Sequence, residues 1–290
     1  MVQEVIFLEK IMFPTFDLLG KTIPTYALMS LIGIFVCGIY ICKKAKQKGY
    51  DENNFIIVLL LSSIGVFFGG HILYAITRFD LIIKLFSNWN TYVHSFWDFI
   101  ECAKLICGGS VFYGGLIGGM IVGFIYCKKK HYNLSDYSDI IAPGIPLFHF
   151  FGRIGCFLGG CCYGIESSFG FTVHNNQLLP SVNDVQRFPV QLLESLLNLI
   201  LFFLLAHLLK KGLLKGKLFA TYLLSYSVIR FFDEFLRGDT YRGFLLGLST
   251  SQIISIVIFI CSIIYLIYQG KKIIHIEKHT YENNHKCVFL

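Results

Sequence analysis

Charged side chains are scarce in this chain. Only 15% of its 290 residues are Asp, Glu, Lys or Arg, whereas 55% are hydrophobic, and the mean hydropathy is +0.63. This composition excludes an ordinary soluble domain, in which about 25% of residues are charged. The sequence also lacks internal repeats, low-complexity tracts and linkers. It therefore predicts a single integral membrane domain over residues 1–290.

The first ten residues lack the features of a secretory signal. They contain acidic residues and no basic stretch ahead of a short apolar core, so we do not expect a cleavable signal peptide. We expect residues 1–23 to lie along the outer face of the membrane and residues 270–290 to form a cytoplasmic tail.

No metal-binding signature is present among the ten cysteines. Cys156, Cys161 and Cys162 cluster, but they form no CxxC pair, and His149 and His174 do not complete a zinc pattern. The sequence therefore predicts no metal site. Small apolar packing residues are the default interpretation of these cysteines, and a disulfide is the alternative if they face outward.

Long apolar segments make up most of the sequence. Seven of them reach the length of about 20 residues that a helix needs to cross the hydrocarbon core. They cover residues 24–42, 54–77, 105–127, 138–159, 188–209, 218–236 and 248–269. The prediction is an all-α polytopic protein with seven transmembrane helices.

Lysine blocks predict the orientation of these segments. Fifteen of the 25 lysines and arginines lie in four blocks that follow the first, third, fifth and seventh segments. Positive residues favour the cytoplasmic side, so the pattern places the N-terminus outside and the C-terminus in the cytoplasm. It favours an odd number of spans, because an even number would leave one block on the wrong face.

The net charge of +7 is explained by the membrane topology. Nucleic-acid binding proteins are also basic, but these lysines lie next to membrane segments, where they set topology and meet anionic lipid head groups. We therefore expect membrane lipids as partners and no nucleic acid.

Two arginines interrupt apolar segments. Arg153 stands in Phe-Gly-Arg-Ile-Gly and Arg230 in Ser-Val-Ile-Arg-Phe-Phe. A charge at membrane depth costs about 2.5–3.5 kcal/mol on insertion scales, and such residues usually face a cavity and serve a function. The two arginines predict a site for an anion inside the membrane domain.

Glycines gather near these positions and allow two interpretations. Gly115 and Gly119 form a GxxxG pair, which is typical of close helix packing. Glycines beside Tyr113 on one segment and Arg153 on another also fit a crevice in which backbone and arginine approach a lipid head group.

Arg230, Glu234 and Arg237 are spaced i, i+4 and i+7, which predicts one helical face with Asp233 close by. One interpretation is a structural ladder of ion pairs. The other is that Glu234 orients the arginines and leaves Arg230 to bind a phosphate through its planar guanidinium.

Five motifs, taken together, support a resemblance. In chain order they are Phe-Tyr113-Gly-Gly-Leu-Ile-Gly, Gly-Arg153-Ile-Gly155, Arg187-Phe-Pro-Val-Gln191-Leu-Leu-Glu194, Ile-Arg230-Phe-Phe-Asp-Glu234-Phe-Leu-Arg237 and Ser249-Thr-Ser-Gln252. The chain resembles prolipoprotein diacylglyceryl transferases over nearly its whole length. The resemblance implies a bacterial cytoplasmic membrane enzyme that transfers the diacylglyceryl group of phosphatidylglycerol to the lipobox cysteine of a prolipoprotein, near its signal peptide. Glycerol phosphate is released, and no cofactor is implied.

The resemblance also implies roles for individual residues. Arg153 and Arg230 would hold the phosphate of phosphatidylglycerol, and these two with Tyr113 are the candidate catalytic residues. The candidate substrate-binding residues, besides the two arginines, are Tyr26, His71, Gly114, Gly155, Cys156, Cys161, Glu234 and Arg237.

The chain departs from the family at four of these positions. The family has His where this chain has Tyr113, Asn at Cys156, Glu at Cys161 and a basic position at His71. Tyrosine, with a pKa of about 10, is a poor general base near neutral pH, although it can donate a hydrogen bond to an oxyanion. His71 is an alternative base, and a packed structural histidine is its competing interpretation.

Three functions remain open. The first is lipoprotein diacylglyceryl transfer, with the incoming thiol activated mainly by the field of the arginines. The second uses the same donor with another acceptor, such as a glycan hydroxyl, and in a variant of it Cys156 or Cys161 is a nucleophile. The third is a lipid-binding protein or transporter without catalysis, which the lack of recognisable inverted repeats argues against.

Overall fold

The computed structural model describes the chain except for residues 1–13, 19, 175–179, 239–243, 246 and 287–290. It divides into two compact units. Unit 1 comprises residues 1–41 and 138–290, and unit 2 comprises residues 42–137.

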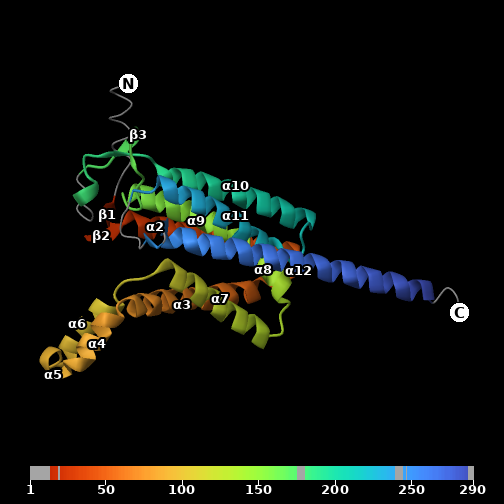
Figure 1. The fold of residues 1–290 in the computed structure, drawn as a ribbon, viewed down its shortest axis with the longest axis horizontal. Helices are drawn as coiled ribbons and strands as arrows, with labels where there is room; N and C mark the ends of the chain where they lie inside the picture. Colours follow the sequence, from red (N-terminus) through yellow and green to blue (C-terminus); the bar gives the residue numbers. More distant parts are fainter. Residues whose placement is uncertain (1–13, 19, 175–179, 239–243, 246, 287–290) are drawn as a thin grey trace. The chain divides into compact units, whose positions relative to one another are not determined.

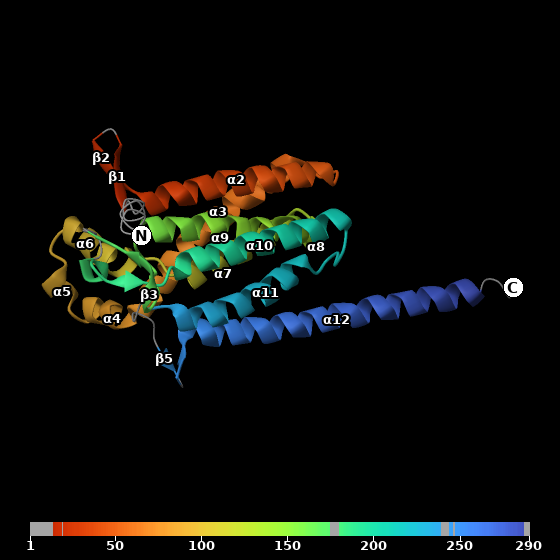
Figure 2. The ribbon, with the colours of Figure 1, turned by 90° about the horizontal axis from the view of Figure 1, so that it is seen from above.

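Unit 1 is built mainly from five helices. α10 packs against α9 and α11, and α11 packs along α12 (Figures 1 and 2). The bounds are Thr25–Gln47 for α2, Gly144–Leu158 for α9, Val190–Lys211 for α10, Leu218–Asp233 for α11 and Thr250–Lys286 for α12. α2 lies against α9, because Gly33 and Gly144 leave room for side chains of the other helix.

Short strands and turns connect these helices. Three two-stranded antiparallel sheets lie among the described residues, each from neighbouring stretches of the chain. They pair β1 (Thr15–Leu18) with β2 (Lys21–Pro24), β3 (Glu166–Thr172) with β4 (Gln186–Arg187), and β5 (Phe244–Leu245) with β6 (Leu248–Ser249). Single 3-10 turns cover Pro180–Val182 and Glu234–Leu236. The short strands leave the fold predominantly helical, as predicted.

A buried aspartate fixes the start of α11. Asp139, on helix α8 (Leu134–Ile141), accepts hydrogen bonds from the backbone N–H groups of Gly216 and Leu218. The first N–H groups of a helix have no partner within the helix, so this carboxylate caps α11 from a distant part of the chain. Asp139 is only 4% exposed.

Unit 2 centres on two long helices in close contact. They are α3 (Glu52–Thr77) and α7 (Phe112–Lys129), and three shorter helices lie between them in the chain: α4 (Phe79–Ser87), α5 (Trp89–Tyr92) and α6 (Phe96–Cys107). A Cβ added to Gly69 or Gly118 would lie less than 2.5 Å from a backbone oxygen of the opposite helix. The glycines therefore set the distance between the helices, as small residues do at membrane helix interfaces.

At the start of unit 2, Tyr50 donates a 2.6 Å hydrogen bond to Asp136. This bond stabilises the neutral phenol and raises the pKa of Tyr50 to about 12. The contact ties the loop after α2 to the beginning of α8.

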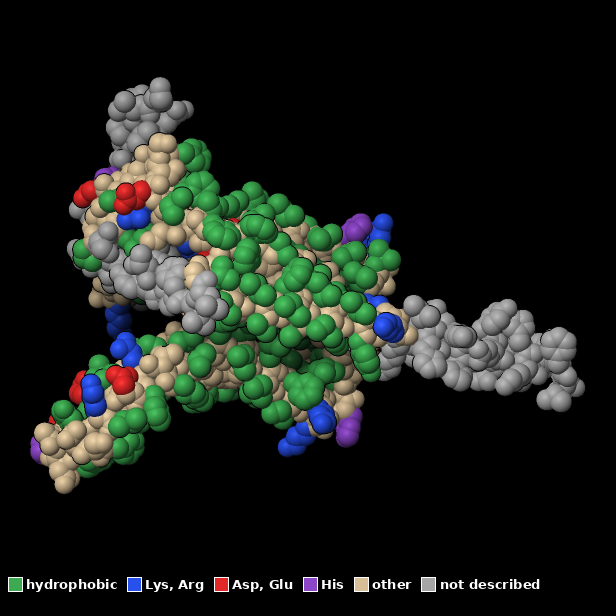
Figure 3. Space-filling view, viewed as in Figure 1, with side chains coloured by type: hydrophobic (Ala, Val, Ile, Leu, Met, Phe, Trp, Pro, Cys, Tyr) green, Lys and Arg blue, Asp and Glu red, His purple; other side chains and the backbone are tan. Residues whose placement is uncertain are grey.

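Helices of both units are long and apolar enough to cross a membrane. Among the described residues, five stretches meet this standard: Thr25–Gln47, Glu52–Thr77, Leu134–Leu158, Val190–Lys211 and Thr250–Lys271. Their outward side chains are apolar, and Ile39 and Phe203 are 66% and 61% exposed. Lipid tails, rather than water, are the solvent that suits such surfaces. Figure 3 shows apolar side chains over the helix bodies and basic ones near helix ends.

Two of the seven predicted spans differ from the structure. The segment 105–127 is not one helix, because α6 ends at Cys107 and α7 begins at Phe112. Gly108, Gly109 and Ser110 are weak helix formers and interrupt it. The segment 218–236 also stops early, since α11 ends at Asp233 and a 3-10 turn follows. The coarser conclusion, a helical membrane protein with at least five candidate spans among the described residues, stands.

Candidate functional site: paired arginines and a thiol cluster

One face of α10 is polar and buried. Gln191, Glu194, Ser195 and Asn198 are each 5% exposed or less, in a helix that is otherwise apolar. Their spacing of i, i+3, i+4 and i+7 places them on one side of the helix. A polar stripe inside an apolar span is expensive unless its groups find partners.

Glu194 is the centre of this stripe. Its Oε1 lies 2.8 Å from Nη2 of Arg153 on α9, and Tyr226 of α11 donates to the same oxygen at 3.2 Å. Glu194 is 1% exposed, so the ion pair is withdrawn from solvent. Glu194 belongs to the Arg187–Glu194 motif, but it was not predicted as the partner of Arg153. The i, i+3, i+4, i+7 pattern of polar residues was the available signal.

Arg230 is held on one side of its guanidinium only. Nη2 lies 2.7 Å from Oε2 of Glu234 and donates to Oγ of Ser251 at 3.2 Å. Nη1 is buried and has no hydrogen-bond partner among the described residues. Asp233, 2% exposed, has one carboxylate oxygen in the same condition. An unsatisfied buried N–H is costly. This group of Arg230 is therefore a hydrogen-bond donor available to a ligand.

The two arginines belong to one electrostatic cluster. Glu194 interacts with the charges of Arg153 and Arg230, and also with that of Arg237. Each of the first two arginines has its own carboxylate partner, and the carboxylates position them without using every guanidinium N–H. The arrangement fits the binding of an anion by two oriented guanidinium groups.

Arg237 does not share a helical face with Arg230. Because α11 ends at Asp233, Arg237 has an extended backbone and pairs with Gly164 in an isolated β-bridge. The expected i, i+7 relation is therefore replaced by a contact with the loop that follows α9. The i, i+4 pair of Arg230 and Glu234 is present.

Tyr26, at the start of α2, lies beside Gly155 of α9. A Cβ on Gly155 would lie 3.3 Å from both Cα and Cδ2 of Tyr26. Gly155 is two residues beyond Arg153 on α9, so the missing side chain lets α2 approach the arginine-bearing helix closely.

Tyr113, Gly114 and His71 lie in unit 2. Gly114 packs against the backbone of Gly69 on α3. Nδ1 of His71 lies 2.7 Å and 2.8 Å from the carbonyl oxygens of Cys107 and Gly109. Both residues thus have contacts within unit 2, and their roles in substrate binding stay predictions.

The end of α9 gathers three cysteines. Gly160 has a φ of +65°, and its N–H donates to the carbonyl of Phe157, while the N–H of Cys161 donates to the carbonyl of Cys156. This pair of bonds is the Schellman motif, which folds the chain back over the last helical turn. It brings Cys161 beside Cys156 although five positions separate them.

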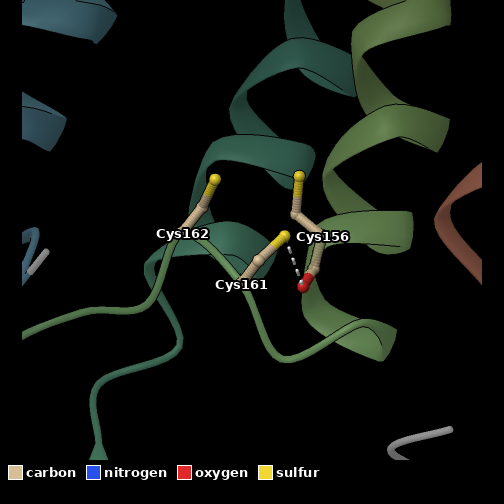
Figure 4. Close-up of side chains that lie close together, drawn as sticks. All are labelled: Cys156, Cys161 and Cys162. Carbon is tan, nitrogen blue, oxygen red and sulfur yellow. Dashed lines mark hydrogen bonds between the residues drawn. The ribbon is translucent and has the colours of Figure 1, made fainter. Parts of the chain in front are cut away.

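The sulfur atoms of Cys156, Cys161 and Cys162 all lie within 4.8 Å of one another. Figure 4 shows Cys161 pointing toward Cys156, with Cys162 next to it on the loop. Cys156 is 7% exposed and the other two are half-buried. All three thiols are free. The spacing of the cysteines alone did not predict that their sulfurs approach one another. A Gly-Gly pair at a helix end, with Cys at C3 and C″, is a signal for this arrangement.

The fold and the site define a class: a helical membrane protein with two carboxylate-oriented arginines, one on α9 and one on α11, helices that both pack against α10. The family model for prolipoprotein diacylglyceryl transferase matches residues 14–268. The chain belongs to this family.

Curated relatives agree over most of their length. The phosphatidylglycerol–prolipoprotein diacylglyceryl transferase of Clostridium tetani is 36% identical over 250 residues, which cover 86% of this chain and 94% of the relative. A second enzyme of that name from Clostridium perfringens is 36% identical over 260 residues, covering 89% and 94%. That of Streptococcus uberis is 32% identical over 260 residues, covering 85% and 91%.

Proposed function

We propose that this protein transfers the diacylglyceryl group of phosphatidylglycerol to the lipobox cysteine of prolipoproteins and releases glycerol phosphate. The relatives carry this donor and this acceptor in their names. The observation that carries the proposal is Arg230, whose Nη1 is buried without a partner among the described residues while Nη2 is held by Glu234 and Ser251.

In this proposal Arg153 and Arg230 bind the phosphate of the donor. The reaction forms a carbon–sulfur bond and breaks the bond between the glyceryl carbon and the phosphate oxygen. Negative charge grows on that oxygen as it leaves. Two guanidinium groups fixed by Glu194 and Glu234 stabilise it without reorganising, which is the most effective form of electrostatic catalysis.

Two further candidates lie at the contact of α2 with α9, the helix that carries Arg153. Tyr26 and Gly155 form the wall of the lipid site at the contact of α2 with α9. Arg237 adds positive charge from the loop after α11. We assign Tyr113 the role of a hydrogen-bond donor to an oxygen of the donor lipid, because a phenol carries an O–H group that can donate.

We further propose a seven-span topology in the bacterial cytoplasmic membrane, with α7 and α11 as short spans. The last turns of α2, α7 and α10 each carry two lysines. If these ends face the cytoplasm, as the positive-inside rule requires, the N-terminus lies outside.

The proposal is tested with the purified protein, labelled phosphatidylglycerol and a lipobox peptide. Label should appear on the peptide cysteine. Arg230→Lys keeps the charge opposite Glu234 but removes the second guanidinium nitrogen, so transfer should fall at least about 100-fold, as when one donor to a developing anion is lost. Arg78→Lys is the matched control, because Arg78 is not among the candidate site residues and its side chain contacts Tyr74.

Unchanged transfer by the Arg230→Lys variant would contradict the phosphate role. Release of glycerol phosphate only when a glycan replaces the peptide would instead support a different acceptor. Phosphatidylglycerol binding without any transfer would favour a non-catalytic protein.

A further inference from the structure

The thiols of Cys156, Cys161 and Cys162 form a compact group at the end of α9. Their sulfurs lie within 4.8 Å of one another, and Figure 4 shows the side chain of Cys161 directed toward Cys156. The thiol of Cys161 donates to the carbonyl oxygen of Cys156 at 3.7 Å. Small side-chain rotations are therefore enough to bring these two sulfurs into bonding contact.

The backbone already meets the requirement for a disulfide between Cys156 and Cys161. Two cysteines can be bridged without backbone movement only when their Cα atoms lie less than about 7 Å apart. The N–H of Cys161 donates to the carbonyl of Cys156 at 3.1 Å, across the turn that Gly160 closes with a φ of +65°. The turn thus brings the two residues together although they are five positions apart in the sequence.

The third thiol has a different relation to this pair. Cys161 and Cys162 are neighbours in the sequence, and a ring closed between neighbours strains the planar peptide bond that joins them. Cys162 therefore stays a thiol beside the bond between the other two sulfurs. Thiols next to a disulfide exchange with it, so Cys162 makes the bond readily reversible.

Reagents from solution can reach the cluster. Cys161 and Cys162 are half-buried on the loop that follows α9, whereas Cys156 is buried. In the proposed seven-span topology this loop lies on the outer side of the membrane. Disulfides form and persist outside the cytoplasm, where the thiol-reducing systems of the cell are absent.

We propose that Cys156 and Cys161 are a modification site at which small-molecule disulfides form a reversible disulfide bond, and that this bond lowers the transfer activity. The second half of the inference rests on the proposed function.

The chemistry balances by thiol–disulfide exchange. The accessible Cys161 attacks the small-molecule disulfide and forms a mixed disulfide, and one small thiol leaves. Cys156 then attacks the sulfur of Cys161, the bond between the two protein sulfurs forms, and the second small thiol leaves. Two protein thiols are oxidised and one small disulfide is reduced. The two protons of the protein thiols end on the two released thiols.

The bond acts on transfer because the cluster adjoins the arginine site. Arg153 stands one helical turn before Cys156 on α9. Gln191 of α10, three residues before Glu194, donates to the carbonyl of Cys161 at 2.8 Å. A crosslink between the two cysteines therefore ties the helix that carries Arg153 to a loop that is itself held by the helix of its carboxylate partner. It also changes the side chains at two candidate substrate-binding positions.

The modification is tested separately from the reaction. Purified full-length protein is treated with oxidised glutathione, and the remaining thiols are blocked. Chymotrypsin cleaves after Phe157, between the two cysteines, so mass spectrometry should find two peptides linked through Cys156 and Cys161 that separate on reduction. Cys161→Ser should lose this link. Cys162→Ser and Cys102→Ser should keep it, because one removes only the exchanging thiol and the other alters a thiol on α6.

The effect on transfer has its own readout. The oxidant is removed before the lipobox peptide is added, so that the thiol of the peptide stays free. The initial rate should fall at least about 10-fold after oxidation, because misplacing a positioned group by ~1 Å costs up to about 100-fold, and dithiothreitol should restore it. In Cys161→Ser the ratio of the rates before and after oxidation should be one at any basal rate. This ratio separates the effect of the bond from the loss of a thiol or a folding defect.

Absence of the linked peptides after oxidation overturns the modification site. Linked peptides with an unchanged rate of transfer overturn the effect on activity and leave the proposed function intact. A reduced protein that forms the bond on oxidation but transfers nothing to the peptide overturns the proposed function and leaves the modification site intact.

Discussion

At the scale of single residues, buried charges dominate the site. Arg153 and Glu194 form an ion pair whose side chains are 16% and 1% exposed. Removing two charges from water costs several kcal/mol for each, and mutual attraction offsets this only when the geometry is good and other hydrogen bonds help. Tyr226 supplies such a bond to Glu194. Neither charge is tolerable without the other.

This dependence gives a prediction for Glu194→Gln. The change leaves Arg153 buried without its counter-charge and should lower the free energy of unfolding by about 3–5 kcal/mol. Thermal denaturation of the detergent-solubilised protein measures it. The control is Glu101→Gln, which breaks the exposed pair with Lys104 and should change stability by less than about 1 kcal/mol. Equal effects of the two substitutions would contradict the account of Arg153.

Single residues were also where prediction from sequence was most uneven. Arg153 and Arg230 stood out because a charge in an apolar segment is expensive wherever it folds. The partners of the two arginines differ in how far they could be predicted. Glu234 is one helical turn from Arg230 and could be paired by spacing alone, whereas Glu194 lies on another helix and its partner depends on tertiary packing.

At the scale of helices and loops, glycines determine how closely two helices can pack. Gly69 and Gly114 face each other on α3 and α7, and a Cβ on either would lie 2.3 Å from the other's carbonyl oxygen. The helix bodies were predictable from hydropathy. The break between α6 and α7 and the end of α11 were missed, although Gly108, Gly109 and Ser110 mark the first and Asp233 and Glu234 the second, because the predicted spans ran through these positions.

Gly69→Val should force α3 and α7 apart. Overpacking of a tight contact costs about 1–3 kcal/mol, and the clash here is with backbone, which cannot rotate away. The thermal midpoint and protease resistance of unit 2 should both fall. Gly38→Ala on α2 is the control, since nothing lies within 4 Å of its added Cβ. A stable Gly69→Val variant would show that the helices are not in backbone contact.

The loop after α9 offers a second prediction at this scale. Gly160→Val places a β-branched residue at a φ of +65°, which costs about 1–2 kcal/mol, and should open the Schellman motif. Cys161 then moves away from Cys156, so binding of an arsenical that bridges two thiols should weaken.

The control for the loop is Gly49→Val. Gly49 has a φ of +82° in the loop after α2, with open space around it, so the backbone penalty is similar and no thiol cluster is involved. Retained arsenical binding by Gly160→Val would contradict the role of the helix end in gathering the cysteines. The sequence grouped the three cysteines, but the approach of their sulfurs depends on how the helix terminates, which linear spacing does not give.

At the scale of the whole molecule, the distribution of basic residues is the main constraint on the membrane topology. The lysine blocks were evident in the sequence, and the structure places residues of three of the four blocks in the last turns of α2, α7 and α10. Five helices meet the length and hydropathy of a span among the described residues. The seven-span topology then requires α7 and α11 to cross as well, so that these three lysine-bearing ends share one side.

Trypsin accessibility tests that arrangement on the intact protein. Cleavage after Lys128 and Lys129 at the end of α7, and after Lys215 and Lys217 ahead of α11, should occur in inside-out vesicles and not in intact spheroplasts. The reason is that moving several lysines across the bilayer is far more costly than crossing with a short apolar helix. Lys21, in the hairpin before α2, is the internal control and should be cut only from the outside. If the Lys128 and Lys215 sites were cut from opposite sides, an odd number of spans would lie between them instead of the two that the seven-span topology requires, and that topology would be wrong.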